Sequence, residues 1–226
     1  MKTNQINAKI TGILFILGTT APIIGGMLAA PVMESPDVLK NMASHQTIVA
    51  LSIISVLIMG LACAGISIAM YPVLKKYRPG MAMGAVGYRL MEGLLAILVA
   101  TGTSAVLMIS KQFATADAST ALQFQTLANL ILTVKDWILN GPLLICWIIG
   151  AALYYTIFYQ FNLVPRWLSL WGLIGITLTF FSSIFVMISP NFGTLQTICS
   201  LPILVQELVL AVWLLVKGFT LTEKTA

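Results

Sequence analysis

The chain has 226 residues, of which 59% are hydrophobic and only 8% are charged. Because a water-soluble domain usually carries about a quarter charged residues, this chain cannot cover a water-facing surface, and the membrane is its solvent. The formal net charge of +5 does not indicate a nucleic-acid-binding protein, because the basic residues lie in short loops beside apolar segments. The lipid bilayer is the expected partner, nucleic acid is not, and the oligomeric state is left open.

Six apolar segments are each long enough to cross a bilayer, which takes about 20 residues at a rise of about 1.5 Å per residue. We expect these spans at residues 10–30, 48–74, 80–109, 137–159, 167–188 and 195–216. Each should be a helix, because a helix satisfies its own backbone hydrogen bonds in lipid. The sequence therefore predicts an all-α membrane protein with six transmembrane helices in a single polytopic domain over residues 1–226.

The third segment carries glycines as well as charges. Gly80, Gly84 and Gly87 recur on one side of its first two turns, and small residues of this kind let neighbouring helices approach closely. We expect this side to pack against another helix. Arg89 and Glu92 lie on a different side, which we expect to face the interior of the bundle.

The stretch between the third and fourth spans is too polar to cross a membrane by itself. Residues 118–134 combine apolar side chains such as Leu122 and Leu130 with polar ones such as Gln125. We expect one interfacial amphipathic helix between spans three and four, or a helix that extends span four at its outer end. Asn140-Gly141-Pro142 predicts a break or kink where this helix meets the span.

Basic residues are distributed unequally between the two sides of this topology. One side, which includes both termini, holds Lys2, Lys9, Lys75, Lys76, Arg78, Arg166, Lys217 and Lys224. The other side holds Lys40, Lys111 and Lys135. Because positively charged loops remain in the cytoplasm, we expect a protein of the cytoplasmic membrane with both termini in the cytoplasm.

Three charged residues fall inside the apolar segments: Arg89 and Glu92 in the third and Glu207 in the sixth. Arg89 lies ten residues after Pro79 and Glu207 lies ten residues before Lys217, so both are about 15 Å deep. An ionised side chain at that depth costs at least about 2.5–3.5 kcal/mol unless it is paired or faces water. We therefore expect Arg89 to pair with Glu207, with Glu92 one turn further out and able to share the guanidinium.

Two acids and one guanidinium leave one carboxylate in excess, and three classes of function stay open. The charges can simply fix how the third and sixth spans dock, in a non-catalytic structural or partner-binding membrane protein. A surplus buried carboxylate can instead take a proton or bind a cation, which favours binding or transport of a small polar or cationic solute. An intramembrane enzyme is least favoured, because Glu92 and Glu207 could act as acid and base but no nucleophile can be singled out.

No metal, cofactor or catalytic residue is predicted. His45 is the only histidine, so no multi-histidine metal site can form. Cys63, Cys146 and Cys199 lie in different apolar segments without the spacing of a metal site, and small buried side chains are the expected role for them.

Four short motifs resemble a known family. They are Tyr71-Pro72-Val73-Leu74, Tyr88-Arg89-Leu90-Met91-Glu92, Val164-Pro165-Arg166 followed by Gly172, and Glu207 followed by Trp213-Leu214-Leu215-Val216-Lys217-Gly218. Together they resemble the bacterial multi-pass membrane family called domain of unknown function 4386, over nearly the whole chain. The resemblance implies a small prokaryotic integral membrane protein and brings no activity, substrate or cofactor with it.

Overall fold

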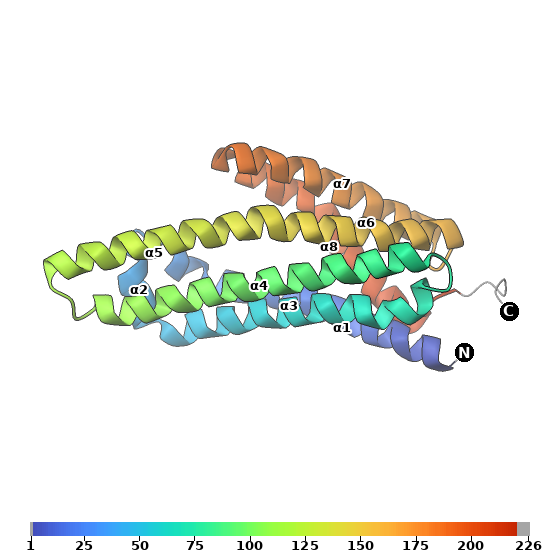
Figure 1. Ribbon diagram of the computed structural model, residues 1–226, viewed down its shortest axis with the longest axis horizontal. Coiled ribbons are helices and arrows are strands. Elements are labelled where there is room, and N and C mark those ends of the chain that lie inside the picture. The colour runs from blue at the N-terminus through green and yellow to red at the C-terminus, as the bar shows by residue number, and fades with distance from the viewer. Residues whose placement is uncertain (1, 221–226) are drawn as a thin grey trace.

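The structure is a bundle of long helices. The computed structural model describes residues 2–220, and all secondary structure in that range is helical. Six helical segments are long and apolar enough to cross a membrane. They are α1 (Lys2–Met33), α3 (Gln46–Leu74), α4 (Pro79–Phe113), the continuous segment Ala118–Phe161, α7 (Arg166–Ile188) and α8 (Gly193–Val216) (Figure 1). The prediction of an all-α fold with six spans is confirmed, and the chain is an integral, multi-pass membrane protein.

The stretch between spans three and four adopts the second of the two predicted arrangements and extends span four. Three consecutive elements form one helix, namely α5 (Ala118–Ile138), the π-helical turn η1 (Leu139–Leu143) and α6 (Leu144–Phe161). The irregularity predicted at Asn140-Gly141-Pro142 takes the form of the π turn, because Pro142 has no N–H to donate and a wider turn lets the helix continue. The separate short helix, α2 (Val38–Ser44), lies between the first two spans.

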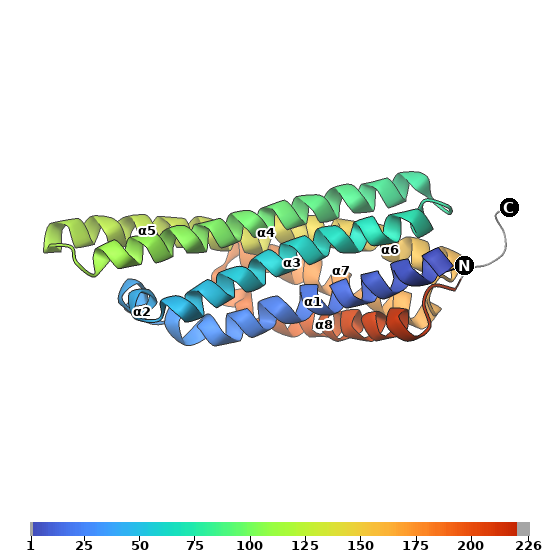
Figure 2. The ribbon, with the colours of Figure 1, turned by 90° about the horizontal axis from the view of Figure 1, so that it is seen from below.

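Two spans are much longer than a bilayer requires. α4 has 35 residues and the α5–α6 helix has 44, which correspond to about 52 and 66 Å of helix. The hydrocarbon core of a membrane is only about 30 Å thick. α4 and α5 pair as a hairpin whose tip projects beyond the other helices, at the end away from the start of α1 (Figure 2).

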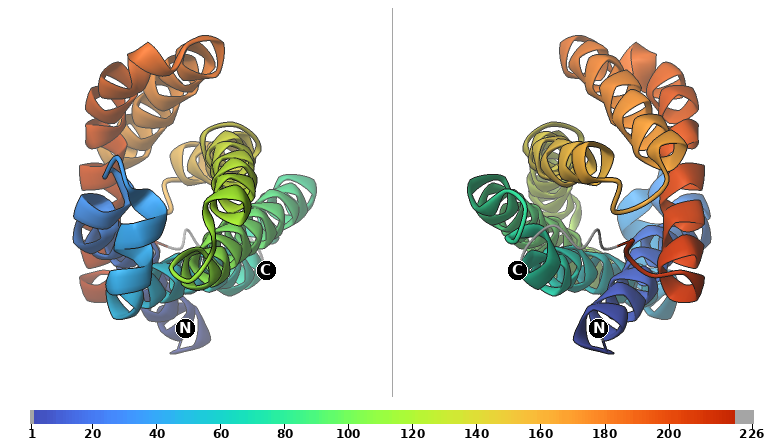
Figure 3. Two further views of the ribbon diagram at one scale, coloured as in Figure 1. Left: turned by 90° about the vertical axis from the view of Figure 1, so that its left-hand side faces the viewer. Right: turned by 90° about the vertical axis from the view of Figure 1, so that its right-hand side faces the viewer.

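The six spans form a connected bundle. α1 packs against α3 and α8, α4 packs against α3, α5 and α6, and α7 packs against α6 and α8. The end-on views show α7 and α8 together on one side of the molecule, with α4 and α5 on another (Figure 3). The largest apolar core lies where α1, α3, α6, α7 and α8 meet, toward the start of α1 and the end of α8. It includes Phe15, Tyr154, Tyr155 and Phe158.

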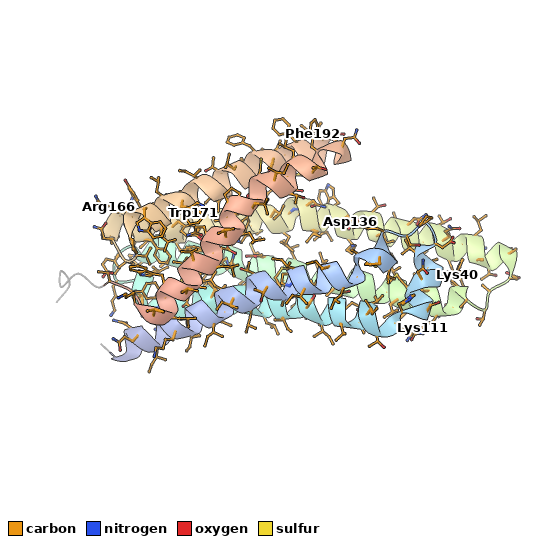
Figure 4. The ribbon with its side chains drawn as sticks, turned by 180° about the vertical axis from the view of Figure 1, so that it is seen from behind. Lys40, Lys111, Asp136, Arg166, Trp171 and Phe192 are labelled. Atoms are coloured by element: carbon orange, nitrogen blue, oxygen red, sulfur yellow. The ribbon has the colours of Figure 1, made fainter. Side chains whose placement is uncertain are left out.

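The loops that the topology assigns to opposite sides lie at opposite ends of the bundle. Arg166 lies at the end where α1 begins, whereas Lys40 and Lys111 lie toward the other end (Figure 4). Lys224, which entered the count of basic residues, lies outside the described residues, as does the side chain of Lys2. The statement that the basic loops lie at opposite ends of the bundle therefore applies to the described residues.

Glycine allows close packing on α4, and its closest approach to another helix lies at Gly93, outside the predicted set. A methyl group on Gly93 would lie 2.7 Å from the carbonyl oxygen of Gly60 on α3, and one on Gly60 would lie 2.9 Å from the carbonyl oxygen of Gly93. Among the described residues, a methyl group on Gly80 or Gly87 would meet nothing within 4 Å. A methyl group on Gly84, in contrast, would lie 3.1 Å from Cδ1 of Leu153 on α6. Of the predicted Gly80–Gly84–Gly87 packing face, only Gly84 therefore meets a neighbouring helix, because spacing shows which residues share a side and not which of them has a neighbour.

Gly93→Ala should lower the melting temperature of the detergent-solubilised protein, because the new methyl group would push α3 and α4 apart. Overpacking of this kind costs about 1–3 kcal/mol. Gly87→Ala is the matched control on the same helix and should leave the melting temperature unchanged or slightly raised, because alanine favours a helix by up to about 1 kcal/mol over glycine. Equal melting temperatures for the two variants would contradict the close α3–α4 contact.

Candidate functional site

A cavity of about 230 Å³ lies inside the bundle between α1, α3, α4, α6, α7 and α8. Most of its lining is apolar, and the three charged residues singled out in the sequence, Arg89, Glu92 and Glu207, all contribute to it. The structure thus brings the three side chains to one place, on two helices that are far apart in sequence. Other residues that line it include Phe15, Thr19, Cys63, Ile66, Trp147 and Ile203.

Arg89 pairs with Glu92, not with Glu207. Its Nη1 atom lies 3.0 Å from Oε2 of Glu92, and the two residues are only 1% and 3% exposed. No ion pair joins Arg89 to Glu207 within the described residues, so the predicted pairing is wrong. Residues three apart on a helix lie one turn apart on the same face, so Glu92 reaches the guanidinium without any contribution from helix docking. Glu207 matches Arg89 in depth but belongs to α8, a different helix around the cavity.

The Arg89–Glu92 pair leaves hydrogen-bonding atoms unused. Nε and Nη1 of Arg89 and Oε2 of Glu92 have no hydrogen-bond partner among the described residues, because the 3.0 Å contact between the pair lacks hydrogen-bond alignment. Buried polar atoms in proteins are nearly always hydrogen-bonded. A guanidinium nitrogen can only donate, so these positions of Arg89 call for an acceptor.

Glu207 is held by two neutral donors. The hydroxyl of Thr19 on α1 donates to Oε2 at 2.9 Å, and the indole N–H of Trp147 on α6 donates to Oε1 at 3.3 Å. Sequence reasoning missed both partners. One signal was present for Trp147: tryptophans of membrane proteins gather at the two interfaces, and this one lies in the interior of span four.

Gly150 makes room for the arginine. A methyl group at this position of α6 would lie 3.1 Å from both Cγ and Cδ of Arg89, closer than side chains ordinarily approach. The aliphatic part of the arginine therefore crosses α6 at a residue without a side chain. Nothing in the sequence around Gly150 indicated this contact, because it depends on the register between α4 and α6.

Aromatic rings lie between the charged residues and the end of the bundle where α1 begins. On that side the rings of Phe15, Tyr154, Tyr155 and Phe158 pack together, with centroids 6.2 Å apart for Phe15 and Tyr154 and 4.6 Å apart for the two tyrosines. On the other side of the charged residues the lining of the cavity continues outward along several helices through Pro22, Ile23, Met59, Leu143 and Ser200. The charged site therefore communicates with one half of the bundle and is separated from the other by an aromatic layer.

Glu92→Gln should destabilise the protein far more than Glu207→Gln. Glu92→Gln leaves a buried guanidinium without its counter-charge, a loss of about 3–5 kcal/mol. Glu207→Gln keeps the Arg89–Glu92 pair and can keep the bonds to Thr19 and Trp147, so its cost should be about 1 kcal/mol. Thermal unfolding of both variants in the same detergent measures the difference in stability. A larger loss of stability for Glu207→Gln than for Glu92→Gln would support the Arg89–Glu207 pairing instead.

Comparison with known proteins places the chain in a family. The sequence model of the family described as Domain of unknown function (DUF4386) matches residues 10–218, a range that contains every residue of the cavity. Comparison with curated proteins and with solved structures gives no match. The chain belongs to the DUF4386 family, a domain of unknown function.

Proposed function

We propose that this protein binds a small polar or cationic solute in the cavity lined by Arg89, Glu92 and Glu207 and carries it across the membrane. The observation that supports this best is that the three charges border about 230 Å³ of space while polar atoms of Arg89 and Glu92 have no hydrogen-bond partner among the described residues. A cluster that only docked helices would be expected to be closely packed and fully hydrogen-bonded. Polar residues buried inside membrane spans commonly mark the route of a solute or proton.

We further propose that the protein lies in the cytoplasmic membrane with both termini in the cytoplasm. The distribution of basic residues supports this orientation, since eight of them belong to the side of the termini and three to the other. In this orientation the aromatic layer faces the cytoplasm and the cavity extends toward the outer surface.

An enzymatic role is the second candidate, and one contact favours it. The Thr19 hydroxyl lies 2.9 Å from a Glu207 oxygen, the arrangement of a nucleophile beside a base, with the donors of Arg89 around the same cavity. Solute binding is preferred because the same contact also serves to hold Glu207 in place. Thr19→Val would remove an enzymatic activity altogether, whereas a binding site would lose one hydrogen bond worth about 0.5–1.5 kcal/mol.

The cysteines of the chain allow a test that needs no knowledge of the solute. Cys63 lines the cavity, whereas Cys146 is similarly buried but does not. With Cys63 as the only cysteine, a small water-soluble thiol reagent should label the protein in membrane vesicles. With Cys146 as the only cysteine, labelling should be at least about tenfold slower, because thiol reactions require access. Equally slow labelling of both would show a cavity closed to water and would contradict the proposed function.

The orientation is tested by cysteines placed at the two ends of the bundle. In a background without native cysteines, Ala116→Cys in the turn between α4 and α5 should react with a membrane-impermeant reagent on intact cells. Lys76→Cys, in the loop between α3 and α4, should react only after the membrane is permeabilised. The reverse pattern would invert the orientation.

A further inference from the structure

The geometry points to a small organic monocation as the ligand of this cavity, namely an ammonium compound that also carries a hydrogen-bond acceptor such as a hydroxyl or carbonyl oxygen. This inference rests on the proposed function and names the class of solute that the same site would take. Three features of the site support it, one each for charge, hydrogen bonding and size.

The charge of the site calls for a single positive charge. Arg89 and Glu92 form a pair with no net charge, at 3.0 Å. Glu207 is 9% exposed, and within the described part of the chain its two oxygens accept from neutral donors alone, Thr19 and Trp147. The site therefore carries one uncompensated carboxylate inside a membrane span, where an unpaired charge is costly. A monocation beside Glu207 makes the cavity neutral, whereas an anion would add to the excess.

The hydrogen bonding of the site calls for an acceptor on the same ligand. Arg89 is 1% exposed and lines the cavity; its Nε has no hydrogen-bond partner among the described residues, and its Nη1 has only the poorly aligned 3.0 Å contact with Glu92. An alkylammonium group offers no lone pair, so it cannot satisfy them. A hydroxyl group can accept from Arg89 and donate to Oε2 of Glu92, which has no aligned hydrogen bond in the described part of the chain.

The size and lining of the site call for a small ligand with a carbon skeleton. The volume of about 230 Å³ lies below the range of about 300–1,000 Å³ that holds drug-sized molecules. Phe15, Ile66, Ile203 and the Trp147 ring supply apolar walls that would disfavour a hydrated inorganic ion.

A set of matched compounds tests these requirements on the full-length protein in lipid nanodiscs. Choline has a positive charge and a hydroxyl. Its neutral counterpart of the same shape, 3,3-dimethyl-1-butanol, lacks the charge, and ethyltrimethylammonium lacks the hydroxyl. Propionate supplies the opposite charge. Each compound is scored by the shift in melting temperature and by protection of Cys63 in the single-cysteine protein against a neutral water-soluble thiol reagent.

Choline should raise the melting temperature and, at about ten times its dissociation constant, slow labelling of Cys63 about tenfold, because about nine-tenths of the sites are then occupied. Ethyltrimethylammonium should bind more weakly, and 3,3-dimethyl-1-butanol and propionate should have no effect. Glu207→Gln should abolish the effect of choline, whereas Glu34→Gln, which changes an exposed acid outside the cavity, should not.

The outcomes separate this inference from the proposed function. If Cys63 is labelled but choline protects it no better than the neutral or anionic compound, the ligand class is wrong while the solute site stands. The same conclusion follows if Glu207→Gln retains the choline effect. If Cys63 is not labelled at all, the proposed function fails and this inference fails with it.

Discussion

The need to keep a guanidinium charged in an apolar interior determines how the centre of this protein is built. Arg89 is 1% exposed and lies about 15 Å along a membrane span, where its charge requires an opposite charge nearby. Glu92 supplies that charge from the same helix, one turn away. Gly150 on α6 gives the side chain the space it needs. With this requirement met locally, Glu207 is not needed for neutralisation and is available to face the cavity.

The elements that the sequence predicts well are those determined by the lipid environment and by the length of each apolar segment. Apolar composition over about 20 residues requires a spanning helix whatever its neighbours, so the six spans could be found from the sequence alone. The depths of Arg89 and Glu207 follow from residue counts, because a helix has a fixed rise. The counts place the two residues at the same depth, and the structure shows that both, with Glu92, line one cavity.

What could not be predicted depends on how the helices are arranged around each other. Equal depth does not show whether two side chains face each other, and the predicted Arg89–Glu207 pairing was wrong for this reason. Arg89 pairs instead with Glu92, which lies one turn away on the same helix. The same uncertainty hid Thr19, whose hydroxyl resembles many others in the spans until α1 is placed beside α8. The choice of Gly93 rather than Gly87 for close packing also depends on helix rotation, which a single sequence does not record.

The unbroken length of two helices links the end of the molecule away from the start of α1 to its centre. α4 runs without interruption from Pro79 to Phe113, and it carries both Arg89 and Glu92. The helix that pairs with it at the tip continues into the span that bears Trp147 and Gly150, with the π turn as its one irregular point. In α4, the tip of the hairpin and the buried arginine therefore belong to one unbroken ladder of backbone hydrogen bonds, whereas in the paired helix the π turn interrupts that ladder between the tip and Gly150.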